Sequence, residues 1–181
     1  LFANEDKFRK TMALVDKELK GSKEDFIKHF KNKYSNDYPP AWMLVEILPL
    51  GIVTRIYDNL ADNALRKKIA ARFLLPVPVF RSWITIITLV RNTCCHHSRV
   101  WNKENAITPM LLKKTPYRWI SKQISPNRTF YDVCILKWFI DIISPENDMK
   151  GHLKNLLSDF PHVDIAAMGF PKNWEEEPLW K

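Results

Sequence analysis

Residues 91–102 hold a cluster of side chains that could act on a phosphodiester. A histidine such as His96 can take or give a proton near neutral pH. Arg91 can hold a phosphate through paired donors, and the amide of Asn92 can orient the imidazole or the substrate. Together these groups suit attack by a ribose 2′-hydroxyl on its adjacent phosphate. That reaction needs proton transfer and charge stabilisation, so we expect no metal and no cofactor.

An α-helix over residues 79–101 would give the two neighbouring histidines different surroundings. On a helical wheel His96 shares a polar face with Asn92 and Arg99. His97 falls on the apolar face with Cys94. We therefore expect His96 to face the substrate and His97 to be a hydrogen-bonded histidine that packs behind the site.

One straight helix cannot aim both catalytic candidates at the same atom. Arg91 and His96 lie five residues apart, which is about 140° around an ideal helix. The site would need a distorted turn, or a second copy of the chain that brings its own pair across a twofold axis. The second solution is the simpler one, and it predicts a homodimer.

The run Cys94-Cys95-His96-His97 also invites two other chemistries. Four consecutive helical residues radiate in different directions and cannot all bind one ion, and Cys134 is the only other cysteine. A zinc site is therefore not expected. A cysteine nucleophile is not expected either, because Cys94 falls on the packing side and Cys95 has no oriented base one turn away.

The whole chain has 181 residues, a mass of 21.4 kDa and a formal net charge of +8. This size predicts a single domain over residues 1–181 that buries a core without disulfides. Three cysteines and no signal peptide predict a reduced, cytoplasmic protein. Because the chain starts at Leu1, we expect it to be part of a longer protein.

The basic excess favours a polyanionic partner, with RNA as the first candidate. Four glycines are too few for a glycine-rich phosphate loop. No run of about 18 apolar residues exists, which excludes a membrane span. The cations expected to follow an RNA backbone are Lys67, Lys68, Lys113, Lys114, Arg118 and Lys122.

Hydrophobic periodicity predicts an all-α protein, with no alternating strand pattern of useful length. The expected helices cover residues 4–20, 22–34, 41–60, 62–73, 79–101, 129–143 and 146–159. Ser22 and Asp25 suggest a capping box for the second helix, with Phe26, Phe30 and Tyr34 as its apolar stripe.

The segment 41–60 is apolar nearly all round, so we expect it to be the central buried helix, kinked or split at Pro49. Pro76 and Pro78 suggest a linker, and residues 102–128 should be irregular. The tail from Pro161 carries Trp174 and Trp180, which could stack RNA bases but more often strap onto a core.

The segment Arg91–Asn102, RNTCCHHSRVWN, resembles the RN-x-x-x-HH-x-R-x-WN core of the Abi-like (AbiD/AbiF type) abortive-infection family. More distantly it is similar to the HEPN superfamily, whose ribonucleases carry an R-x(4-6)-H motif. The resemblance extends to PAWMLVE at residues 40–46 with Gly51, and to MGFP at residues 168–171 with Trp174. It covers residues 26–180, and the N-terminal part of a typical member would be absent.

The resemblance implies a HEPN-like helical bundle with long irregular connections and an aromatic C-terminal tail. It also implies a dimer, metal-independent RNA cleavage that leaves a 2′,3′-cyclic phosphate, and a function in phage defence. The motif positions fall on Arg91, Asn92 and His96. Supporting roles are expected for Glu46, His97, Arg99 and Asn102.

For Glu46 two interpretations stay open, since a carboxylate in an apolar helix should be paired. It could serve the site through Arg91 or Arg99, or it could simply pair with a structural arginine. The alternative function for the whole chain is a non-catalytic module that binds RNA or neutralises a toxin. For the protein in general we also consider an antitoxin or a regulatory RNA as a partner.

Overall fold

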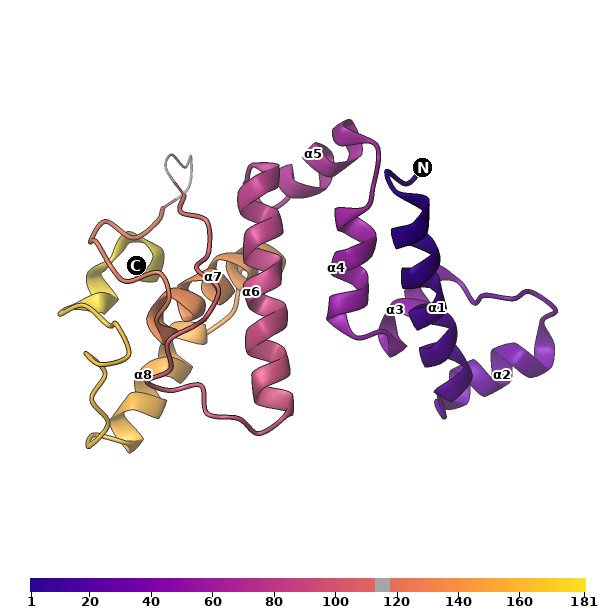
Figure 1. Cartoon of the computed structure of the whole chain (residues 1–181). Helices are drawn as coiled ribbons and strands as arrows, with labels where there is room; N and C mark the ends of the chain where they lie inside the picture. The colour runs from indigo at the N-terminus through magenta and orange to yellow at the C-terminus, as the bar shows by residue number, and fades with distance from the viewer. Residues whose placement is uncertain (113–117) are drawn as a thin grey trace. The chain divides into compact units, whose positions relative to one another are not determined.

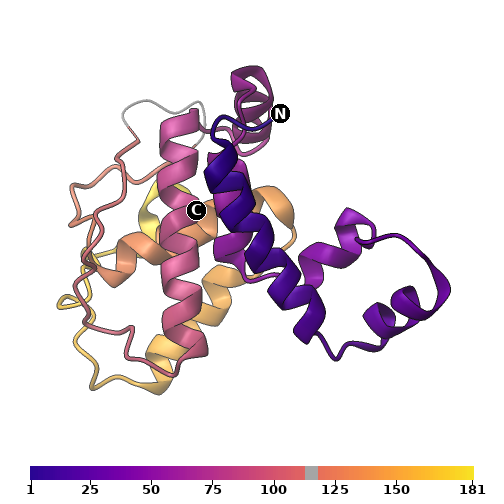
Figure 2. The same cartoon turned by 45° about the vertical axis from the view of Figure 1, so that its right-hand side comes forward.

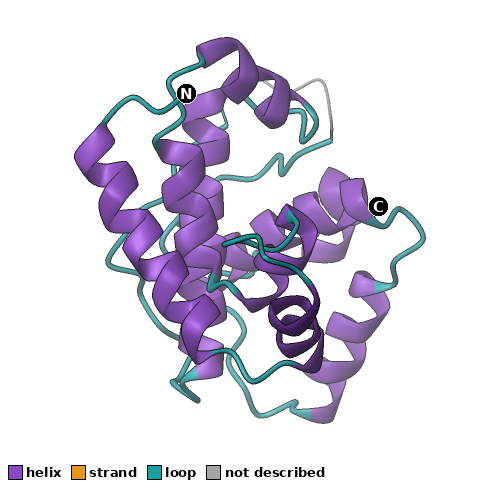
Figure 3. Cartoon of the chain, turned by 90° about the vertical axis from the view of Figure 1, so that its right-hand side faces the viewer, coloured by secondary structure: helices purple, strands orange, loops and turns teal. Residues whose placement is uncertain are grey.

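The computed structural model describes residues 1–112 and 118–181, and it confirms an all-α fold. These residues contain eight α-helices and two short 3-10 helices. Figure 3 shows helices and loops in them and no strand. The contacts divide the chain into two compact units, Leu1–Arg66 and Lys67–Lys181, each described by itself below.

Unit 1 contains α1 (Glu5–Gly21), α2 (Asp25–Lys33), α3 (Ala41–Ile47) and α4 (Leu50–Asp58), in the order of Figure 1. Asn4 caps α1, because its Oδ1 accepts a 2.8 Å hydrogen bond from the backbone N–H of Lys7. Helices α1 and α4 lie side by side, and the buried residues Val15, Leu48 and Ile52 fill the space between them.

The start of α2 differs from the predicted capping box. Glu24 rather than Ser22 is the residue before the helix, and its own backbone N–H donates to Ser22 Oγ at 3.4 Å. Beginning at Asp25, the helix buries Ile27 and Phe30. The expected stripe is therefore wrong at its two ends, since Phe26 and Tyr34 are exposed. Figure 2 shows α2 and the loop that leads to α3.

The prediction that residues 41–60 form the central buried helix is wrong, although the break at Pro49 is confirmed. Pro49 separates α3 from α4 and is the first residue before α4. Helix α3 buries no residue, and the side chain of Trp42 is 69% exposed. A unit of this size cannot enclose a helix that is apolar on every side.

Unit 2 contains the end of α5 (Asn63–Ala71), then α6 (Val77–Cys95), α7 (Thr129–Ile143) and α8 (Met149–Asp159). Pro76 and Pro78 do not form a linker. They begin α6, because proline suits a helix's first turn, where backbone N–H groups have no intrahelical partner. Helix α8 starts at Met149 rather than at residue 146, since Asp148 Oδ1 accepts a hydrogen bond from Gly151 N.

Helix α7, predicted with these bounds, is the central helix of unit 2. Trp83 of α6 contacts its Trp138 edge to face, with ring centroids 5.8 Å apart. On another side, Phe130 lies 4.4 Å from Phe170 of the tail. Trp180 is 1% exposed and donates from its indole N–H to Cys134 Sγ at 3.4 Å.

The aromatic tail is thus part of the core. Trp174 and Trp180 are both buried, in short 3-10 helices over Trp174–Glu176 and Pro178–Trp180, which confirms the strap and removes them as base-stacking candidates. The predicted irregular stretch is also confirmed for the described part of residues 102–128. None of the described helices is long and apolar enough to cross a membrane.

Candidate active site at the end of α6

Helix α6 ends at Cys95, in the middle of the motif, and the backbone shows why. His97 has φ of 51°, a left-handed conformation. Its N–H donates to the carbonyl of Cys94 at 2.9 Å, and the N–H of Ser98 donates to the carbonyl of Thr93 at 2.9 Å. These two bonds make a Schellman motif, in which the left-handed residue that stops the helix is usually glycine.

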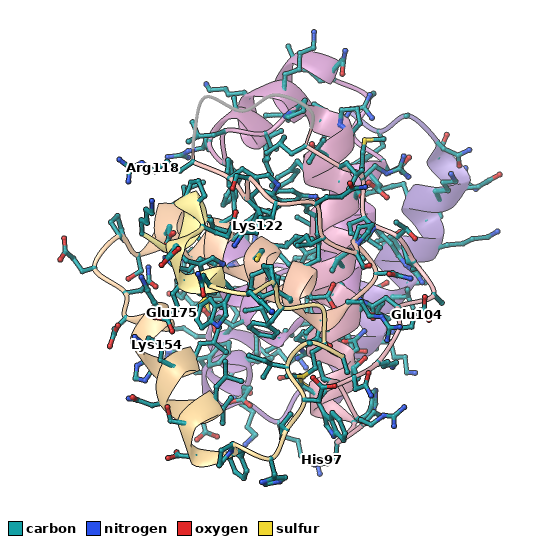
Figure 4. The ribbon with its side chains drawn as sticks, turned by 90° about the vertical axis from the view of Figure 1, so that its left-hand side faces the viewer. His97, Glu104, Arg118, Lys122, Lys154 and Glu175 are labelled. Atoms are coloured by element: carbon teal, nitrogen blue, oxygen red, sulfur yellow. The ribbon has the colours of Figure 1, made fainter. Side chains whose placement is uncertain are left out.

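This ending corrects the helical wheel beyond Cys95. His96 is the capping residue, with φ of −91° and ψ of 14°, and Arg99 is outside the helix altogether. His97 is exposed rather than packed against the core, and it is labelled in Figure 4. Cys94 is exposed as well, although the wheel placed it on the packing face.

The three catalytic candidates still lie on consecutive turns of one helix end. Arg91 Nη1 donates to Asn92 Oδ1 at 3.3 Å, and the backbone N–H of His96 donates to the carbonyl of Asn92 at 3.0 Å. The side chains of Arg91 and His96 are exposed, and Asn92 is half-buried. A guanidinium and an imidazole are therefore exposed to solvent within one turn of Cys95, and a half-buried amide lies beside the guanidinium.

The rest of the motif forms a turn rather than a helix. Arg99 is exposed and Asn102 has φ of 46°, a second left-handed residue. Asparagine tolerates this conformation better than most residues, because its short side chain can hydrogen-bond locally. His97 and Asn102 therefore shape the backbone at the two ends of this turn, and their supporting roles at the site stay predictions.

The segment after the turn is attached to the start of α7, which the sequence did not reveal. Thr129 Oγ1 donates to the carbonyl of Val100 at 3.0 Å. The backbone N–H of Asn105 donates to the carbonyl of Asn127 at 2.8 Å. Nδ2 of Asn127 in turn donates to Oε1 of Glu104 at 2.6 Å. These partners are more than 20 residues apart, so no local pattern could have indicated them.

A buried carboxyl completes this attachment. Asp132 is 3% exposed, and its Oδ2 accepts a 2.6 Å hydrogen bond from Asn105 Nδ2. Within residues 1–112 and 118–181 no hydrogen-bond partner reaches its Oδ1. Burial raises the pKa of Asp132 to about 6, although the bond from Asn105 acts in the opposite direction.

Glu46 lies on α3 in unit 1, and its side chain is exposed. It lines a hollow of about 620 Å³ together with residues of the α1–α2 connection, among them Lys17 and Lys23. Arg91 and Arg99 belong to unit 2, so the pairing of Glu46 with either arginine stays a prediction.

Lys67, Lys68 and Arg118, three of the cations expected to bind RNA, lie away from the motif at the end of α6. Lys67 and Lys68 are exposed on α5, which lies near the N-terminal end of α6, whereas Cys95 is at the C-terminal end of that helix. Arg118 is exposed, and Figure 4 shows it near the opposite end of unit 2 from His97. Lys113 and Lys114 lie outside the described residues.

Lys122 has contacts inside the chain. Its Nζ donates to the carbonyl of Lys172 at 2.6 Å and lies 3.4 Å from Glu177 Oε1. Burial acts to raise the pKa of Glu177, but hydrogen bonds from Ser121 and Lys122 outweigh it, and the pKa lies below its ordinary value. The contact therefore joins residues 121–122 to the tail.

The positive charge belongs mainly to unit 2. This unit contains 17 of the 28 Lys and Arg residues but only 10 of the 20 Asp and Glu residues. Unit 1 is close to neutral. Any long-range attraction of RNA would therefore act on the unit that carries Arg91 and His96.

Cysteines and acidic residues form no cluster that suits a metal ion in the described part of the chain, where no three His, Cys, Asp or Glu side chains come close enough together. Cys94 and Cys95 are exposed, and Cys134 is buried beneath Trp180. Burial raises the pKa of the Cys134 thiol well above its ordinary value, so that thiol is unsuited to nucleophilic chemistry.

Comparison with known proteins gives one match. The family described as Abi-like protein matches residues 2–102, which is more than half of the chain and includes the whole of the Arg91–Asn102 motif. The match starts nearer the N-terminus than the resemblance did and leaves out the tail. Neither the curated proteins nor the solved structures gave a match. On the family match, this chain belongs to the Abi-like protein family.

Proposed function

We propose that this Abi-like protein is a HEPN-type, metal-independent endoribonuclease whose site is formed by Arg91, Asn92 and His96. The Abi-like family suggests a function in abortive infection, the defence of bacteria against phage. The observation that carries the proposal is the end of α6. There the guanidinium of Arg91 contacts the amide of Asn92 at 3.3 Å, and the capping residue His96 is exposed one turn later.

The chemistry follows from these three groups. An imidazole at His96 takes the proton from a ribose 2′-hydroxyl, whose oxygen attacks the neighbouring phosphorus. Arg91 stabilises the negative charge that builds up on the phosphoryl oxygens, because its paired donors fit two of them. The bond to the 5′-oxygen breaks, which leaves a 2′,3′-cyclic phosphate and a 5′-hydroxyl after that oxygen is protonated.

Two proton transfers call for two groups, a base for the nucleophile and an acid for the leaving group. We infer that the second group is His96 of another copy in a homodimer. The end of α6 is exposed and therefore open to such a partner. The capping residue His96 still donates its backbone N–H to the carbonyl of Asn92, as in a helix, so its side chain begins about 140° around the helix from Arg91. This offset supports a site shared between two copies.

The test is cleavage of a 5′-labelled single-stranded RNA in the presence of EDTA. We expect the wild type to cut and to leave cyclic phosphate ends, and we expect His96→Ala and Arg91→Ala to lose activity by at least about 100-fold. His152→Ala is the matched control, since His152 is an exposed histidine on α8 that does not belong to the motif. Cleavage that survives both site substitutions would overturn the assignment.

Binding of RNA without cleavage, in wild type and variants alike, would instead support the non-catalytic RNA-binding or toxin-neutralising function. The dimer is tested separately with heterodimers of wild-type and His96→Ala protein. Because the proposed reaction uses His96 from both copies, we expect these heterodimers to be as inactive as the His96→Ala homodimer. Activity confined to a monomeric species in sedimentation would rule the shared site out.

A further inference from the structure

The chain between α6 and α7 carries half of the motif, and its end is fixed to the first turn of α7. Val100 is bound by Thr129, and Asn105 is bound twice, through its backbone to Asn127 and through its side chain to Asp132. Residues 96–105 therefore form a loop held between two fixed points. One is the end of α6, and the other is the buried start of α7.

These contacts differ in strength. Glu104 is largely exposed, and its pair with Arg128 spans 3.8 Å, so this ion pair contributes less than about 1 kcal/mol. Asp132 is 3% exposed, and its 2.6 Å bond to the half-buried Asn105 is partly shielded from water. A shielded hydrogen bond to a carboxyl group is stronger than an exposed one, and its loss leaves a buried polar group unpaired. The Asn105–Asp132 bond is therefore a stronger anchor of the loop than the Glu104–Arg128 pair.

We propose that Asp132 is a positioning residue for the site at the end of α6, and that it holds His96, Arg99 and Asn102 in place through Asn105. This inference rests on the proposed ribonuclease function, because positioning is meaningful only for a site that acts on a substrate. Asp132 touches no catalytic candidate itself. It acts through the loop.

The geometry of the turn makes such an anchor necessary. His97 and Asn102 both have left-handed backbones, which cost free energy in residues other than glycine. A turn of this kind keeps its shape only when its surroundings hold it. The Schellman bonds at His97 and Ser98 fix its first end, and the Asn105–Asp132 bond fixes its last end.

Burial of a carboxyl here has a cost, and the raised pKa of Asp132 reflects it. An alanine or leucine would pack at this place without that penalty. An anchoring function explains why a buried acid lies at this position and accepts a hydrogen bond from the loop. Only the acceptor oxygen is needed for it, so an asparagine at position 132 would serve equally well.

Four variants test the proposal by RNA cleavage under single-turnover and steady-state conditions. Asp132→Ala removes the acceptor, and Asn105→Asp sets two carboxyls against each other. We expect both to lower kcat by about tenfold or more while the affinity for RNA changes less than about twofold, since misplaced catalytic groups slow the reaction without removing binding cations. Asp132→Asn and the double variant Asn105→Asp/Asp132→Asn restore a donor and an acceptor, and we expect kcat near that of the wild type.

Loss of stability alone is controlled by Ile135→Val, which weakens the same helix through an apolar side chain that cannot hydrogen-bond to the loop. Its kcat should stay unchanged. Hydrogen exchange of residues 96–105 gives a second readout that needs no activity. We expect exchange to be faster in Asp132→Ala and normal in the double variant.

The outcomes separate the two proposals. Faster loop exchange in Asp132→Ala, rescued in the double variant, supports the anchor even if the wild type cuts no RNA, and in that case the ribonuclease proposal fails alone. Unchanged exchange and unchanged kcat in Asp132→Ala would overturn the positioning role while leaving the ribonuclease intact. A double variant as slow as Asp132→Ala would overturn it too, because the hydrogen bond would then not be what matters.

Discussion

The backbone N–H of His97 donates to the carbonyl oxygen of Cys94 at 2.9 Å, and this bond ends α6 inside the family motif. Two adjacent histidines consequently have different tasks. His96 is a capping residue with an exposed imidazole, whereas His97 is a turn residue with φ of 51°.

Glycine at position 97 should therefore be tolerated. We expect His97→Gly to raise the free energy of unfolding by about 0.5–1 kcal/mol, because glycine adopts a left-handed backbone without strain. His97→Val should lower it by about 1–2 kcal/mol, because a β-branched residue resists this conformation. Urea unfolding followed by circular dichroism measures both. If glycine destabilises as much as valine, the imidazole of His97 makes a contact that the backbone does not explain.

Asp132 should make the protein less stable as the pH rises through about 6. Its pKa is raised from 3.8 to about 6 on folding, so the folded state holds the proton over this range while the unfolded state has released it. Stability from this group is fully present below about pH 4 and is lost by about pH 6, a change of up to about 3 kcal/mol. Unfolding at pH 4, 5, 6 and 7 should show this slope in the wild type, and Asp132→Asn should flatten it.

The contribution of Glu177 to stability should depend on pH in the opposite direction. Its pKa is lowered on folding, so its contribution is present above the ordinary glutamate pKa and is lost as the pH falls through the lower, folded value. We expect Glu177→Gln to cost about 1–3 kcal/mol at pH 7, since a neutral amide accepts less strongly from Ser121 and Lys122. The cost should shrink below pH 4. A cost that stays the same at pH 3 would show that charge is not its source.

Alanine substitutions at Trp180 and Trp101 should differ in their effect on stability, because Trp180 packs in the core and Trp101 lies at the surface. Trp180 is 1% exposed and contacts Phe130 and Trp174, so Trp180→Ala should cost about 3–5 kcal/mol. Trp101 is 51% exposed, and Trp101→Ala should change stability by less than about 0.5 kcal/mol. Thermal unfolding compares the two. A mild effect at Trp180 would mean that the tail is not part of the core.

Both ends of helix α7 could be predicted from the sequence, and at its C-terminal end Ser144 and Pro145 stop the run of apolar residues. The end of α6 could not. Glycine usually marks a Schellman motif, and in Cys-Cys-His-His no glycine or proline interrupts the helical pattern. The helical wheel therefore ran past Cys95 and placed His97 on a packing face.

The sequence alone also could not show which apolar helix lies at the centre of the core. Segment 41–60 and α7 are both strongly apolar, and α7 has aromatic partners on more than one side, Trp83 and Phe170. Apolar composition shows that a helix can be buried, and not which other segments will cover it. The candidates Arg91, Asn92 and His96 were identified by residue type, whereas Asp132 and Asn105 meet across 27 residues and emerge only from the fold.

The burial of the tail also affects when unit 2 can fold during synthesis. During synthesis the apolar faces of α7 leave the ribosome well before Phe170, Trp174 and Trp180, which cover them. Unit 2 therefore cannot close its core cotranslationally until its last residues have been added. A nascent chain that stalls before Trp174 would present an uncovered aromatic surface to chaperones and proteases.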